Sequence, residues 1–135
     1  FCEAKKNNFE KVICWGDGSP LREFLHCDDL ADACIFSLEN INISKIKDLS
    51  KFQDSYFSHI NVGTGNDISI AGLAGLIANL VDFQGEIVWD KEKPNGTPQK
   101  KLDINLMSKL GWKHNITFKK GIEKTIYEFQ NLLLR

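Results

Sequence analysis

Short apolar runs alternate with segments of helical periodicity along this chain of 135 residues. Lys11–Trp15 is a β-branched and aromatic run that ends at a turn containing two glycines and a proline, a pattern that predicts a strand. Residues 86–90 (EIVWD) predict a second strand, and residues 59–62 (HINV), closed by a glycine-rich turn, predict a third. Residues 23–27 are interpreted either as one more short strand or as an extended lead-in to a helix.

Helical periodicity is clearest from residue 70 to residue 81, where apolar side chains recur at three- and four-residue steps behind Ser69 as N-cap. A second helix is predicted to begin at Asp28 or Asp29, either of which can cap it. Shorter helical segments are expected at 45–52 and 105–110. The last helix begins near residue 118, and its expected buried positions are Phe118, Ile122, Ile126, Phe129 and Leu133. Because strands and helices alternate throughout, the predicted fold class is α/β.

The first residues, FCEAKKNN, are typical of the last turns of a helix that ends at Asn7 and Asn8. The chain has no methionine at its start and begins inside this element. We therefore expect it to be a piece of a longer protein.

Composition narrows the class of protein further. Hydrophobic residues make up 42% and charged residues 26%, as in ordinary globular domains. The net charge of -1 gives no electrostatic reason to expect nucleic acid as a partner, and the absence of a signal peptide or long apolar span gives none to expect a membrane. The four cysteines form no C-x-x-C pair, so no metal site is expected, and free thiols fit a cytoplasmic location.

Several catalytic signatures can be tested against the sequence, and none is complete. Gly63-x-Gly65 lacks the third glycine of a dinucleotide fingerprint, since Ile68 stands in its place, and a tight turn is the better interpretation. Neither tyrosine is followed four residues later by lysine. The neighbouring His26 and Cys27 suggest a nucleophile and its base, but on an extended segment adjacent side chains point to opposite faces. No catalytic or cofactor-binding residue is assigned.

Two polar loops remain as candidates for ligand chemistry. In WGDGSPLREF, Trp15 offers a flat aromatic face and Arg22 a planar fork suited to phosphate oxygens. A local ion pair between Arg22 and Glu23 or Asp28 is an equally open interpretation at this point. The second loop, DKEKPNGTPQKKLD, combines a rigid Pro/Gly turn with cations at positions 93, 100 and 101. Together the loops suggest an anionic ligand held at both ends.

These segments carry a family resemblance over nearly the whole chain. WGDGSPLREFLHCDDLADA, then HINVGTGNDISIAGLAGLIA, then GEIVWDKEKPNGTPQKKLD, LGWK and GIEKTIYEF resemble the C-terminal part of the GDP-L-fucose synthase family, which are extended short-chain dehydrogenases/reductases. The REFLH.DD segment is shared with many nucleotide-sugar epimerases, and K-P-x-G-T-P-x-K narrows the resemblance to this family.

The resemblance implies a fold, a reaction and a cofactor. Residues 1–135 would be the substrate-binding portion of an enzyme whose N-terminal Rossmann half holds NADPH and the catalytic side chains, and strand 59–62 would complete that Rossmann sheet. The intact enzyme would use NADPH to epimerise and reduce GDP-4-keto-6-deoxy-D-mannose to GDP-L-fucose, as a cytoplasmic homodimer. This chain alone is expected to be inactive.

Carried over by position, the resemblance gives Trp15 and Arg22 contacts to the GDP-sugar and places Lys100 near the nucleotide phosphates. Asn95 occupies a substrate-contacting position where the family usually has aspartate, and Gln99 stands where arginine is usual. Asn95 keeps hydrogen-bonding capacity without charge, so ligand choice is open. Two alternatives also stay open: a related NAD(P)-dependent sugar-nucleotide epimerase or dehydratase, and a non-catalytic module that binds nucleotide sugars.

Overall fold

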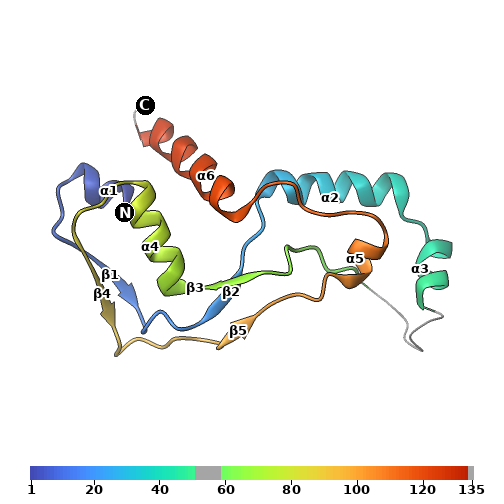
Figure 1. The fold of residues 1–135 in the computed structure, drawn as a ribbon, viewed down its shortest axis with the longest axis horizontal. Coiled ribbons are helices and arrows are strands. Elements are labelled where there is room, and N and C mark those ends of the chain that lie inside the picture. The colour runs from blue at the N-terminus through green and yellow to red at the C-terminus, as the bar shows by residue number, and fades with distance from the viewer. Residues whose placement is uncertain (51–58, 134–135) are drawn as a thin grey trace.

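The computed structural model describes residues 1–50 and 59–133. Helices and strands alternate along the chain, which confirms the α/β class (Figure 1). In chain order the elements are α1 (Cys2–Lys6), β1 (Lys11–Trp15), β2 (Leu21–Glu23), α2 (Cys27–Asn40), α3 (Ile43–Ser50), β3 (Asp67–Ser69), α4 (Ile70–Leu80), β4 (Glu86–Asp90), β5 (Gln99–Lys100), α5 (Asn105–Lys109) and α6 (Phe118–Leu133).

The described strands form two small sheets. β1 and β4 pair in parallel, and β2 lies between antiparallel β3 and parallel β5. In β1 the side chains alternate, so that Val12 is half-buried whereas Ile13 and Trp15 are exposed. Val12 and its register partner Ile87 pack beneath α1 and α4. The strand period thus directs the indole of Trp15 away from the core.

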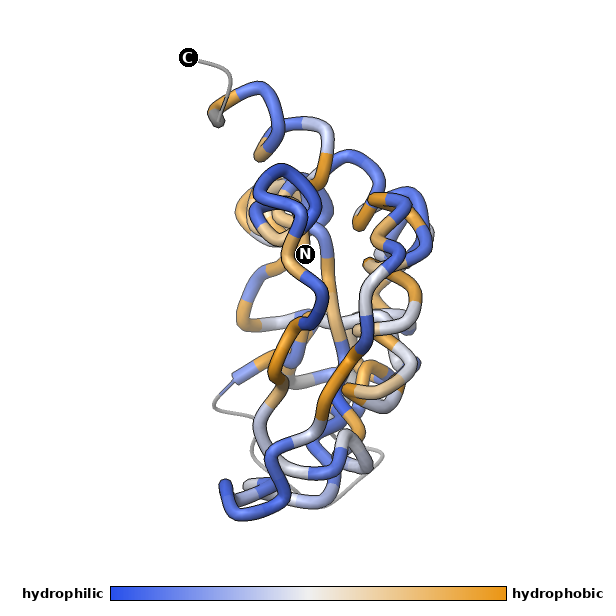
Figure 2. Tube along the Cα trace, turned by 90° about the vertical axis from the view of Figure 1, so that its left-hand side faces the viewer, coloured by the Kyte–Doolittle hydropathy of each residue, from blue (hydrophilic) through white to orange (hydrophobic). Residues whose placement is uncertain are grey.

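Two separate apolar clusters hold the fold together. One joins α1, α4 and the first sheet, and the other joins α2, α5 and the segment around residue 112; in Figure 1 they lie at opposite ends of the molecule. Figure 2 shows hydrophobic stretches within the body of the molecule and a mostly hydrophilic loop at the lower end of the view. The buried members are Ala4, Ala78, Val81 and Phe83 in the first cluster, and Ala33, Met107 and Trp112 in the second.

The predicted helix behind Ser69 is confirmed. α4 begins at Ile70, and the Ser69 hydroxyl accepts the backbone N–H of Gly72 at 3.0 Å. The predicted strands at 11–15 and 86–90 are confirmed at the same bounds. The predicted helix end in residues 1–8 is also present, since α1 stops at Lys6 and Asn8 adopts a positive φ of 54°.

The predicted cap of α2 is wrong. The helix begins at Cys27, one residue before the earlier of the two predicted starts, and its cap is His26, whose Nδ1 accepts the backbone N–H of Asp28 at 3.2 Å. An imidazole nitrogen serves the same purpose as a carboxylate here, because any acceptor in that place satisfies a free N–H of the first turn. Asp28 and Asp29 are consequently free for contacts with other segments.

The predicted strand at 59–62 is not observed among the described residues. These four residues belong to no β-ladder, and Ile60 and Val62 instead pack against the cluster around Trp112. A strand requires a neighbour to exchange hydrogen bonds with, and no described strand lies beside them. Whether they complete a sheet with further chain stays a prediction.

Three smaller expectations also changed. Of the two interpretations of 23–27, the strand is wrong, since β2 ends at Glu23, and the lead-in to a helix agrees with residues 24–26, which precede α2 with His26 in an extended conformation. The helical segment expected at 45–52 is α3, Ile43–Ser50, and the last two residues of the expected range lie outside the described residues. In α6, Phe129 is 41% exposed, which contradicts its expected burial, whereas Ile126 packs against the first cluster; the side chain of Leu133 is outside the description.

Among the described residues, no helix is both long enough and apolar enough to cross a membrane.

Candidate functional site

The two polar loops predicted from the sequence lie against each other. Asn95 Oδ1 accepts the backbone N–H of Asp17 at 2.8 Å and so joins the loop after β4 to the turn after β1. The contact is close, because a Cβ on Gly16, whose φ is +78°, would stand 2.1 Å from Asn95 Oδ1. Only glycine permits this backbone path without strain. The amide of Asn95 is thus already engaged within the protein.

Asp17 also takes part in this loop contact. Hydrogen bonds from Ser19, and then from Asn95, lower the pKa of its carboxyl below the ordinary value. The backbone N–H of Ser19 donates to Asp17 Oδ1 at 2.8 Å. The turn after β1 is therefore organised around an ionised carboxylate and the Asn95 amide.

Trp15 stands at the end of β1 with 70% of its surface exposed. Lys93 Nζ lies 5.8 Å from the centroid of its ring, within the range of a cation–π interaction. Trp15 is therefore near the second loop, as expected. It does not, however, line the pocket that contains Arg22.

Arg22, the middle residue of β2, borders a pocket of about 270 Å³. Nη1 donates to the carbonyl of Leu21 at 2.7 Å, and no ion pair joins the guanidinium to a carboxylate among residues 1–50 and 59–133. A Cβ on Gly96 would lie 3.7 Å from Nη2, so the Pro/Gly loop passes beside the charged group. The other lining residues are Phe24, Thr64, Asn66, Asp67, Ile68, His114 and Phe118.

Lys100 is next to Arg22 in the sheet. The parallel register of β2 and β5 pairs Arg22 with Lys100, and side chains in register project from the same face. Both cations therefore serve one face of the sheet. Gln99, the preceding residue, donates from Nε2 to the Asp67 carboxylate on β3.

Sequence reasoning missed Glu23 as a structural element of this site. Its Oε1 accepts the backbone N–H groups of Thr64 and Gly65, the latter at 2.6 Å, and its Oε2 accepts the N–H of Leu102 at 2.8 Å. Burial alone would raise the pKa of this carboxyl, but the hydrogen bonds from Leu102, Gly65 and Thr64 outweigh burial and lower the pKa below its usual value. The partners lie 41 to 79 residues away in sequence, so no local pattern could reveal them.

The sequence argument against Cys27 as a nucleophile, that its side chain and that of His26 point to opposite faces, is wrong. Because Cys27 begins a helix, its Sγ is 3.9 Å from His26 Nδ1, so the two side chains are close and do not point to opposite faces. Nδ1 is already the acceptor for the Asp28 N–H. Sγ lies farther from it than the usual reach of a nucleophile and its base.

The same segment brings possible metal ligands together, which the cysteine spacing did not suggest. Ligand atoms of His26, Cys27 and Asp28 lie within 4.8 Å of one another. Asp28 Oδ2, however, receives Lys124 Nζ at 2.6 Å, and His26 Nδ1 caps α2. Two of the three groups thus already have partners in the protein.

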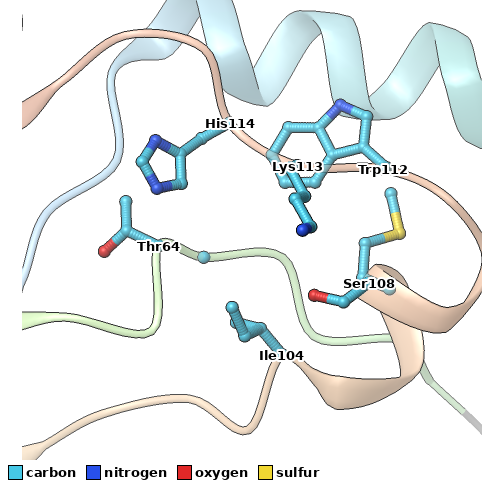
Figure 3. Close-up of a pocket in the computed structure, with 8 residues that line it drawn as sticks. Thr64, Ile104, Ser108, Trp112, Lys113 and His114 are labelled. Carbon is cyan, nitrogen blue, oxygen red and sulfur yellow. The ribbon is translucent and has the colours of Figure 1, made fainter.

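A second, larger pocket of about 380 Å³ adjoins the first and shares Thr64 and His114 with it. Figure 3 shows Thr64 and His114 on one side of this cavity, with Lys113, Ser108, Ile104 and Trp112 around the rest. None of the four site residues predicted from the sequence lines it.

Comparison with known proteins supports the resemblance seen in the sequence. The profile of the NAD dependent epimerase/dehydratase family matches residues 2–63. A putative GDP-L-fucose synthase 2 from Arabidopsis thaliana is 46% identical over 96% of this chain, which spans 35% of that protein. The GDP-L-fucose synthase of Escherichia coli strain K12 is 42% identical over 96% of this chain and 39% of its own length.

A solved structure agrees in fold. The GDP-D-glycero-L-gluco-heptose synthase from Campylobacter jejuni, determined in the presence of NADPH, is 41% identical with a TM-score of 0.75, over 96% of this chain and 37% of that chain. The chain is thus similar to GDP-L-fucose synthases and, over residues 2–63, to the NAD dependent epimerase/dehydratase family, and it spans a little over a third of the length of those synthases.

Proposed function

We propose that this chain is the GDP-sugar-binding portion of a GDP-L-fucose synthase, an enzyme that epimerises and reduces GDP-4-keto-6-deoxy-D-mannose with NADPH. The observation that carries the proposal is Arg22. Its guanidinium borders a pocket without a carboxylate partner among the described residues, next to Lys100 and beside the loop at Gly96. The identities of 42–46% to GDP-L-fucose synthases support this choice of ligand.

Arg22 has the role of binding the diphosphate in this proposal. A guanidinium offers two parallel N–H donors that match a pair of phosphate oxygens. Lys100 adds a second positive charge on the same sheet face. Two cations near the phosphates match the charge of a nucleoside diphosphate, which a neutral sugar alone would not require.

Trp15 and Asn95 have supporting roles in the proposal. The exposed indole, with Lys93 near its ring, offers a flat apolar surface beside the ligand. Asn95 Oδ1 accepts the backbone N–H of Asp17 and so holds the loop. Only the remaining hydrogen-bonding capacity of its side-chain amide is available for the substrate.

The glycine turn at residues 63–65 is not available to NADPH. The one turn with a Gly-x-Gly pattern after position 62 has its amides at Thr64 and Gly65 bonded to Glu23, so they are not available to a cofactor phosphate. The cofactor would supply hydride from a site elsewhere in the whole enzyme. We accordingly propose that this chain alone is inactive. As a separate part of the proposal, the whole enzyme is a cytoplasmic homodimer.

A second candidate has an observation in its favour. The similarity to the GDP-heptose synthase from Campylobacter jejuni, at 41% identity, is close to that of the fucose synthases. A GDP-heptose as the sugar would leave the proposed diphosphate contacts unchanged. The nucleotide is therefore the common element of both candidates, and the sugar distinguishes them.

Titration calorimetry with the chain tests the GDP preference that both candidates share. GDP and GDP-L-fucose are expected to bind, and UDP-glucose and dTDP-glucose to bind at least about tenfold more weakly. Equal affinity for all four ligands would contradict a GDP-specific site. With NADPH and the keto sugar added, the chain should oxidise no NADPH. Any turnover would contradict the proposal that this chain binds the GDP-sugar but is inactive alone.

A further inference from the structure

Glu23 lies close to the proposed ligand site, but it has no role in the ligand contacts proposed above. It is the last residue of β2, adjacent to Arg22. Side chains alternate along a strand, so Glu23 leaves the sheet on the face opposite to Arg22. Its carboxylate nevertheless reaches two segments that border or flank the Arg22 site, residues 64–65 and Leu102.

On one side the carboxylate occupies a backbone nest. The successive N–H groups of Thr64 and Gly65 both point at Oε1, and Gly65 has a φ of +71°. Consecutive N–H groups in such a turn form a concave anion site. A Cβ on Gly63 would stand 2.4 Å from Oε1, so this position leaves no room for a side chain. The tight glycine turn expected from the sequence thus holds an internal anion, the Glu23 carboxylate.

On the other side the carboxylate fixes the strand that carries Lys100. Oε2 accepts the N–H of Leu102 at 2.8 Å, two residues beyond Lys100. Thr64, held by Oε1, lines the Arg22 pocket. One ionised group therefore connects a wall of the pocket, the strand of Arg22 and the segment after Lys100.

We propose that Glu23 is a positioning residue, which sets the placement of Arg22 relative to Thr64 and Lys100 and touches no ligand itself. The inference rests on the proposed function, in which Arg22 and Lys100 bind the GDP diphosphate. Without this carboxylate, the segments that contain Thr64 and Leu102 would lose their common attachment to β2. Arg22 and Lys100 would then no longer be held at a fixed distance from each other.

The test uses Glu23→Gln and Glu23→Ala in the chain, with Glu86→Gln as matched control. Glu86 is an exposed glutamate on β4 and stands in register with Lys11. In amide NMR spectra without ligand, the Thr64, Gly65 and Leu102 resonances should move upfield in both Glu23 variants, and hydrogen exchange at these amides should accelerate about tenfold or more. The control should leave them unchanged. Unchanged exchange at Leu102 in Glu23→Ala would overturn the proposal.

Ligand binding provides the second readout. GDP affinity should fall about tenfold in Glu23→Ala, and formate should restore it in a saturable way by occupying the vacated nest, whereas chloride at equal ionic strength should not. GDP affinity equal to wild type in Glu23→Ala would also overturn the proposal. If wild type itself failed to bind GDP, the proposed function would be rejected, and the exchange data would still decide the role of Glu23.

Discussion

At the scale of single residues, the choice for Arg22 was between a local ion pair and a ligand contact. Each carboxylate that could have paired with it is bonded elsewhere: Glu23 to backbone N–H groups on two sides, and Asp28 to Lys124. Glu23, the next residue of β2, also projects from the face of the sheet opposite to Arg22. The local pair is therefore not formed, and the guanidinium faces the pocket.

The ionised state of Glu23 makes a prediction about pH. Because its pKa in the folded protein lies below the ordinary value of 4.5, its contribution to stability is complete above about pH 4.5 and is lost as pH falls through the lowered value. Chemical denaturation at a series of pH values should show wild type more stable than Glu23→Gln at neutral pH, with the difference shrinking below pH 4.5. A difference that is independent of pH would contradict this assignment.

At the scale of elements, the start of α2 connects distant segments through its acids. Asp29 is 3% exposed, and its two oxygens accept the N–H groups of Asn115 and Ile116, each at 3.0 Å. Asp32, one turn later, accepts the indole N–H of Trp112 at 2.8 Å. These bonds hold the segment before α6 against α2, which is where His114 reaches both pockets.

Removal of the Asp29 carboxylate should therefore be costly. Asp29→Ala leaves the N–H groups of Asn115 and Ile116 without their partner in a partly buried place, at about 1–2 kcal/mol each. The free energy of unfolding, from urea denaturation, should fall by about 2–4 kcal/mol. Glu39→Ala, at an exposed position of the same helix, is the control, and an equal small effect of both substitutions would show that the Asp29 bonds contribute nothing special.

The elements show which features a sequence can predict. The strands at β1 and β4 and the helix behind Ser69 follow from local period and capping, and they are observed as predicted. The cap of α2 was predicted wrongly because aspartates are common caps. In the structure Asp29 accepts the N–H groups of residues 115–116 and Asp28 accepts Lys124, so both carboxylates have tertiary partners. The role of Glu23 depends on folding that brings residues 64 and 102 to either side of it, which no local window contains.

At the scale of the whole molecule, two small apolar clusters flank the sheet that carries Arg22. The loops predicted to share a ligand do come together, through Asn95 and Asp17 and through Gly96 and Arg22. The sequence predicted this from residue types alone, and the fold supplies the register of Arg22 with Lys100 that joins the two cations. The chain covers only a little over a third of its relatives' length, so chemistry on the sugar is assigned to the whole enzyme.

The central claim is that Arg22 binds the diphosphate of a GDP-sugar. The most direct measurement is the GDP affinity of Arg22→Gln by titration calorimetry, with Lys119→Gln, an exposed cation on α6, as control for the loss of one charge. A lost charge-assisted hydrogen bond of about 1.5–3 kcal/mol corresponds to binding that is about tenfold to a hundredfold weaker. Arg22→Gln is predicted to show that loss while Lys119→Gln binds as wild type; equal affinity of all three proteins would contradict the claim.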